Sequence, residues 1–150
     1  MKKLLVFSMV FVSFVSYAQI QKLELPKEIK VGEIKPMGTF IVDLTYYVSE
    51  LDNVKNFSLT YRNGKYITLD DYKTIKFKGD DETITSLYNV FHDAFKTDDI
   101  KSYEQTIKLG DELITIKGYK MMGIKGVQFL TKWGWLNPIN ESQLNKLFGK

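Results

Sequence analysis

The clearest pattern of apolar and polar positions lies in residues 81–96. Apolar side chains recur there at steps of three and four residues, and polar side chains fill the positions between them. At about 100° per residue the apolar positions form one stripe, which is typical of an amphipathic helix. A stripe that carries three aromatic rings needs a broad apolar partner, so we expect the helix to pack on a sheet. The stripe consists of Ile84, Leu87, Tyr88, Phe91 and Phe95.

Before this helix, apolar and polar residues alternate with the two-residue period of β-strands. Residues 39–48 form the first clear strand, and Ile75 and Phe77 point inward from the last strand of this group. We expect the helix to be covered mainly by the apolar face of these strands together with Ile107 from a later strand. The expected partners are Phe40, Leu44, Leu59, Ile75 and Ile107.

The Asn63-Gly64 pair indicates a hairpin between these strands. A two-residue loop would put the apolar positions of the two strands on different faces. A three-residue loop over residues 62–64 pairs Leu59 with Ile67 and keeps one apolar face. The sequence therefore predicts a type I turn with Gly64 in a left-handed conformation.

After the helix, residues 103–109 and 112–116 form a second predicted hairpin. A two-residue loop at Gly110-Asp111 puts Ile107 opposite Ile114, and glycine in the first position fits a type II′ turn. The strand is expected to continue to residue 122, to turn within residues 123–126 and to return as residues 127–133.

The predicted order is four strands, a central helix, three strands and a short C-terminal helix, with Asn140 as its N-cap. This order favours an α+β fold in which an antiparallel sheet of about seven strands packs on one central helix. Residues 39–150 are expected to form a single domain. Residues 19–38 contain Pro26 and Pro36, and we expect an extended segment of edge strands or an ordered loop.

Residues 1–18 have the pattern of a secretory signal peptide. Two lysines precede an apolar run of about twelve residues, and small residues stand at the −3 and −1 positions for cleavage before Gln19. The run is shorter than the roughly 20 residues that span a bilayer, and no later run is as long. We therefore expect an exported bacterial protein, periplasmic or extracellular, without a membrane span in the mature chain.

The net charge and the composition limit the classes of partner that the protein is expected to bind. The formal net charge is +3, and it falls to about +1 without the signal, which carries two lysines and no acid. Arg62 is the only arginine, although arginine is the residue that reads guanine and phosphate with two hydrogen bonds. Nucleic acid is therefore not expected as a partner. The chain has no cysteine, so its core must hold the fold without disulfides.

No catalytic motif is found along the chain. His92 is the only histidine, and its neighbour Asp93 points about 100° away on the helix, so the pair is not expected to act as a base and its orienting acid. Three aspartate pairs lie at predicted turns or helix ends, and none has the spacing of a calcium loop. We expect no metal and no cofactor. A binding module is expected in preference to an enzyme. An enzyme built from acids that meet only in the fold stays open.

Two segments are candidates for binding. If residues 133–135 stay extended, the indoles of Trp133 and Trp135 share one face and could form a platform for a sugar; the alternative is that they close the end of the core. The second segment is apolar, contains methionine and lies between Gly118 and Gly126, and it could either adapt to a partner or cover the core. Its candidate residues are Tyr119, Met121, Met122 and Ile124.

The sequence therefore predicts an exported, non-enzymatic module that binds a protein partner. The alternative is a domain that binds a glycan or another small ligand at Trp133 and Trp135.

Overall fold

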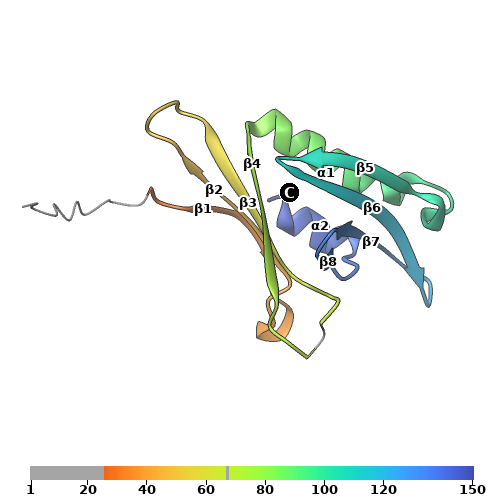
Figure 1. The fold of residues 1–150 in the computed structure, drawn as a ribbon. Helices are drawn as coiled ribbons and strands as arrows, with labels where there is room; N and C mark the ends of the chain where they lie inside the picture. The colour runs from red at the N-terminus through yellow and green to blue at the C-terminus, as the bar shows by residue number, and fades with distance from the viewer. Residues whose placement is uncertain (1–25, 67) are drawn as a thin grey trace, which may run out of the picture.

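The computed structural model describes residues 26–66 and 68–150, so the predicted signal peptide lies outside the described residues. Within these residues, eight strands form two antiparallel sheets of four, and two α-helices lie between and beside them (Figure 1). The α+β class with antiparallel strands is confirmed. The strands are, however, divided between two sheets instead of one sheet of about seven.

The first sheet is an antiparallel meander in the order β1-β2-β3-β4. Its edge strand β1 falls within residues 19–38, so this part of the expected extended segment pairs along β2. The strands are β1 (Ile29–Ile34), β2 (Val42–Val48), β3 (Lys55–Arg62) and β4 (Tyr72–Gly79), with a 3-10 turn η1 (Pro36–Gly38) between the first two.

The prediction of a hairpin with a three-residue loop at Asn63-Gly64 is wrong. Strand β3 pairs with β4, so Leu59 lies opposite Ile75 instead of Ile67, which itself lies outside the described residues. Gly64 is not among the residues with a left-handed backbone. The chain between the two strands is a longer connection that contains residues 63–71.

The reason for this error is a contact distant in sequence. Asn63 is only 1 % exposed, and its side-chain amide donates to the Trp133 carbonyl oxygen at 3.0 Å and to Asp71 Oδ2 at 2.8 Å. The backbone N–H of Gly64 donates to the Trp135 carbonyl oxygen at 2.8 Å. An Asn-Gly pair that resembles a local turn therefore joins the first sheet to the second.

The second sheet has the order β5-β6-β7-β8. The predicted register of its first hairpin is confirmed, with Ile107 opposite Ile114 and Gly110 at φ +61°. The next turn is tighter than expected: it consists of Met122 and Gly123, both with positive φ. The strands are β5 (Glu104–Leu109), β6 (Glu112–Met121), β7 (Ile124–Thr131) and β8 (Gly134–Trp135).

The central helix α1 (Asp81–Lys96) has the predicted bounds. Asp80 is its N-cap and accepts from the Thr83 backbone N–H at 2.8 Å. Helix α2 (Glu141–Leu147) has the predicted cap, because Asn140 and Gln143 exchange hydrogen bonds at 2.9 Å. A short 3-10 turn, η2 (Ile100–Ser102), follows α1.

The core lies between the two sheets, where α2 contacts β1, β2 and β7 (Figure 1). Phe91 is 3 % exposed, as the stripe predicts. Its ring partners differ from the expected residues of the first sheet: they are Phe129 on β7 and Phe148 after α2. Helix α1 thus packs mainly on the second sheet and on α2, and it touches the first sheet at β4.

Candidate functional site

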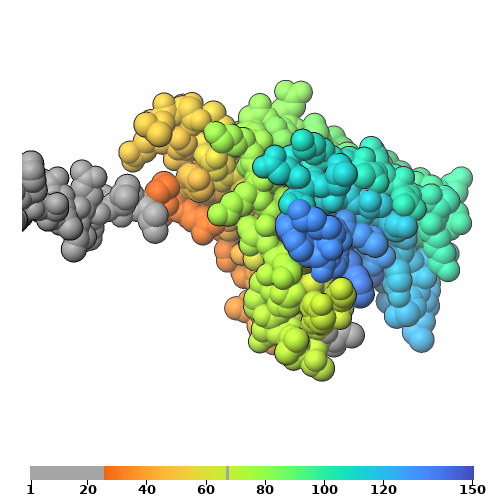
Figure 2. Space-filling model, viewed as in Figure 1, coloured from red at the N-terminus to blue at the C-terminus, as the bar shows by residue number. Residues whose placement is uncertain are grey.

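The turn between β6 and β7 forms an exposed apolar projection. We call residues 119–125 the hairpin tip; it stands out from the body of the molecule at the lower right of Figure 2. Met122 is 93 % exposed, Ile124 67 % and Met121 57 %. Large apolar side chains that keep more than half of their surface exposed are typical of contact sites for partners.

The two faces of the hairpin tip differ in chemistry. Met121 lies opposite Ile124 on one face, and Tyr119, two residues before Met121, lies on the same face. Lys120 lies directly opposite Lys125 on the other face. Like charges placed opposite each other on neighbouring strands destabilise the pair, so the fold alone gains nothing from these two lysines.

A pocket of about 270 Å³ lies under the apolar face of the hairpin tip. Tyr119, Met121 and Ile124 form one wall, and Pro138 stands on the opposite side. Gly126 lies opposite Tyr119 and forms the floor; a Cβ there would come within 3.4 Å of Pro138. The lack of a side chain at residue 126 thus keeps the pocket open.

The far wall is built by the chain that leads into α2. Ile139 and Val127 exchange backbone hydrogen bonds of 2.8 and 2.9 Å, and this pairing holds residues 136–139 along β7. The capping residues Asn140 and Gln143 also line the pocket. An apolar recess with a few fixed polar groups at its rim is the usual form of a specific binding site.

The structure brings three of the four candidates of this segment together. Tyr119, Met121 and Ile124 line the pocket, whereas Met122 stands at the turn outside it. Sequence reasoning missed Pro138 and the two capping residues as parts of the site. Their capping pattern is visible in the sequence, but nothing local indicates that the start of α2 returns to the hairpin tip.

The charge around the hairpin tip is positive. The sequence from Leu113 to Asn140 contains four lysines and no acid. Lys117 pairs with Glu104 at 3.0 Å and Lys132 with Glu112 at 3.0 Å. Within the described residues, Lys120 and Lys125 form no ion pair. Two cations without an ion pair among the described residues therefore lie on the other face of the hairpin tip, and Lys125 also lines the pocket.

The two tryptophans do not lie on one continuous extended strand. Trp133 sits in the turn between β7 and β8, with Lys132 Nζ 4.6 Å from its ring centroid. Trp135 is 37 % exposed, lies opposite Leu130, and packs its indole against Gly64. The geometric condition for a two-ring platform is therefore not met, while Trp135 alone keeps an exposed face.

His92 has a partner that the sequence did not reveal. Its Nε2 lies 2.9 Å from Glu141 Oε1, and its ring stacks on Tyr88 at 5.2 Å. Asp93 instead pairs with Lys96. Among the described residues, no three histidine or acidic side chains are placed to hold a metal ion.

No described helix is long and apolar enough to cross a membrane. Comparison of the chain with protein-family models, with curated proteins and with solved structures finds no match.

Proposed function

We propose that this protein is an exported bacterial, non-enzymatic module that binds a protein partner through the hairpin tip and the pocket beneath it. The observation that carries the proposal is the combination at one site of an apolar wall, a recess of about 270 Å³ and an opposed pair of lysines. In the monomer Met122 is almost fully exposed and the lysine pair is unfavourable, and a bound partner would use both.

The chemistry of the site defines the partner. An apolar side chain of the partner fills the recess between Ile124 and Pro138. Carboxylates of the partner pair with Lys120 and Lys125 and relieve their repulsion. Methionine side chains adapt to the shape of the partner because they are flexible and polarisable.

An anionic membrane is the other surface that an apolar, cationic projection could contact. A bilayer would take up the protruding Met122 but would not use a recess behind it. The pocket and its polar rim of Asn140 and Gln143 favour a partner that inserts a side chain.

Site-specific photocrosslinking in cells tests the proposal. A benzophenone amino acid at Met122 should crosslink one protein, and the same amino acid at Leu51, which is 99 % exposed in the β2–β3 turn, should not. The purified partner should then bind wild type and the control Lys35→Glu equally. The double variant Lys120→Glu/Lys125→Glu and the variant Ile124→Asp should each weaken binding at least about tenfold.

Three results would contradict the proposal. Equal crosslinking from positions 122 and 51, or equal affinity of all variants, removes the hairpin tip as the site. Binding to phosphatidylglycerol vesicles that depends on Met122 and needs no protein shows a membrane site instead. Turnover of a peptide, ester, glycoside or phosphate by the purified protein contradicts a non-enzymatic role.

Export is tested separately. Mass spectrometry of the protein from cell fractions should give a mature chain that begins at Gln19, in the periplasm or the medium. A cytoplasmic chain that retains residues 1–18 would contradict export.

The glycan alternative makes a different prediction at Trp133 and Trp135. Its support is the exposed face of Trp135 beside Leu130. Titration with polysaccharide fragments should then change the tryptophan fluorescence, and Trp135→Ala should abolish the change. An unchanged spectrum at saturating fragment concentrations removes this alternative.

A further inference from the structure

A second recess lies at the first sheet, on the face turned away from the core. It has a volume of about 520 Å³ and shares no lining residue with the pocket at the hairpin tip. Strands β2, β3 and β4 and the β5–β6 turn contribute to it. We call this recess the sheet groove.

Strand register builds the sheet groove. Tyr47, Asn56 and Lys78 lie side by side across β2, β3 and β4. In the adjacent row, Ser58 on β3 lies beside Lys76 on β4. The central strand therefore supplies short polar side chains, and the flanking strands supply long ones that form the walls. Phe57 and Phe77 also line the groove, so its surface is both polar and apolar.

The β5–β6 turn closes one end of the groove. Gly110 approaches β4 so closely that a Cβ would lie 2.2 Å from the Lys76 carbonyl oxygen. This contact places Asp111, the second turn residue, at the groove. Because backbone meets backbone there, the position of the turn relative to β4 is fixed.

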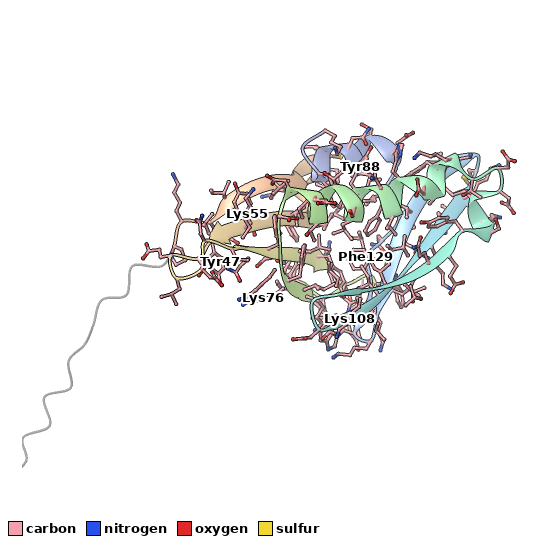
Figure 3. All side chains as sticks on the ribbon, turned by 90° about the horizontal axis from the view of Figure 1, so that it is seen from above. Tyr47, Lys55, Lys76, Tyr88, Lys108 and Phe129 are labelled. Atoms are coloured by element: carbon pink, nitrogen blue, oxygen red, sulfur yellow. The ribbon has the colours of Figure 1, made fainter. Side chains whose placement is uncertain are left out.

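The charges in the groove are less compensated than those elsewhere on the first sheet. Lys55 and Lys73 form ion pairs of 2.6 and 2.8 Å. Lys78, which lines the groove, forms a longer ion pair with Asp52 at 3.5 Å. Lys76 and Asp111 both line the groove and form no ion pair within the described part of the chain. Figure 3 shows Lys76 and Lys108 on one side of the molecule, away from Tyr88.

We propose that the sheet groove binds a sugar acid, as a free unit or as part of an acidic polysaccharide. Lys76 and Lys78 bind the carboxylate, since charge-assisted hydrogen bonds are the strongest polar contacts available to such a group. Asn56, Ser58 and Asp111 bind hydroxyl groups. Tyr47, 36 % exposed at the wall, offers its ring to the face of the sugar.

The mixture of charges selects this class of ligand. A compact anion such as phosphate needs only the lysines and is repelled by the Asp111 carboxylate. A neutral sugar leaves Lys76 without a partner. A ring that carries one carboxylate and several hydroxyl groups satisfies both charges at once. The inference does not rest on the proposed protein partner, because the two recesses are built from different residues.

Calorimetric titration of the full mature chain with trigalacturonate tests the inference, at an ionic strength near physiological so that unspecific attraction is screened. Trigalacturonate should bind wild type, whereas maltotriose and inorganic phosphate should not. Lys76→Met and Tyr47→Ala should each lower the affinity at least about tenfold, or about 1.4 kcal/mol. The control Lys65→Met, an exposed lysine in the β3–β4 connection, should bind like wild type.

The inference is overturned if trigalacturonate fails to bind wild type, if maltotriose or phosphate binds as well as trigalacturonate, or if Lys76→Met and Lys65→Met behave alike. The changed side chains are exposed, so the variants should fold, and far-ultraviolet circular dichroism checks this. The variant Lys120→Glu/Lys125→Glu should retain trigalacturonate binding. If this variant no longer binds trigalacturonate, the sugar binds at the hairpin tip and the inference is overturned too.

Discussion

At the scale of single residues, Phe91 and His92 are neighbours on α1 with opposite environments. Phe91 is buried against Phe129 and Phe148, and core Phe→Ala changes cost about 3–5 kcal/mol. We expect that loss for Phe91→Ala. His92→Ala removes the side-chain contact with Glu141 at the edge of the helix and should cost less than about 1 kcal/mol. Denaturant melts of the two purified variants provide the measurement, and a larger loss for His92→Ala would contradict the orientation of the helix.

Asp43 is a partly buried acid on β2, the strand that lies between β1 and β3. Its Oδ1 has no hydrogen-bond partner among the described residues, and burial raises the pKa of the carboxyl above its usual 3.8. Lys30 and the Thr60 backbone N–H lower the pKa, whereas Glu28 and Glu33 raise it, and burial outweighs the lowering contacts. The folded protein therefore binds this proton more tightly than the unfolded chain does.

The pKa of Asp43 predicts how stability depends on pH. The contribution of the protonated carboxyl is fully present below the usual pKa and is lost as pH rises through the raised pKa. Asp43→Asn cannot ionise, so the variant should gain stability over wild type on going from about pH 3 to about pH 7. Urea midpoints of both proteins at the two pH values check this. A difference that is independent of pH, or that shrinks toward neutral pH, would refute it.

At the scale of elements, local patterns in the sequence predicted what local forces decide. The bounds and cap of α1, the Gly110 turn and the cap of α2 all depend on residues within one or two turns of the chain. The β3–β4 register was not predictable in this way, because Asn63 is committed to Trp133, seventy residues later. The sheet groove was missed for the same reason, since it needs Ser58 beside Lys76.

Alanine substitutions at two turn glycines distinguish the cost of backbone strain from the cost of a steric clash. Gly110 and Gly123 both have positive φ, at +61° and +80°, so alanine at either should cost about 1–2 kcal/mol for the left-handed backbone. A Cβ at residue 123 meets nothing within 4 Å, whereas one at residue 110 meets the Lys76 carbonyl oxygen. Gly110→Ala should therefore cost about 1–3 kcal/mol more than Gly123→Ala. Equal denaturation midpoints would show that the β5–β6 turn can move away from β4.

At the scale of the whole molecule, the candidate sites depend on contacts between residues that are far apart in the sequence, and no local pattern predicts such contacts. The exposed wall of the hairpin tip was predictable from its methionines and glycines. Its pocket was not, because Pro138 and α2 return to it through the pairing of Val127 with Ile139. The same arrangement places α2 between the sheets, where it contacts β1 and β2 on one side and β7 on the other.

Helix α2 should therefore make the two sheets unfold together. Leu144 is fully buried and Leu147 is 3 % exposed. The end of the helix is so close to β1 that a Cβ at Gly32 would lie 2.4 Å from the Leu147 carbonyl oxygen. Truncation of a core leucine costs about 2–5 kcal/mol, a large part of the roughly 5–15 kcal/mol available to a domain of this size. We expect Leu144→Ala to lower the stability of both sheets by that amount, although the residue belongs to neither.

Two probes report on the sheets separately. Hydrogen exchange of the β6 amides follows the second sheet, and hydrogen exchange of the β3 amides follows the first. In Leu144→Ala both signals should shift to lower urea concentration together, and in the exposed control Ser142→Ala neither should shift. Loss of protection in β6 alone, with β3 still protected, would mean that the first sheet is stable without α2. The two sheets would then be separate cooperative units, and the hairpin tip and the sheet groove could respond to their ligands independently.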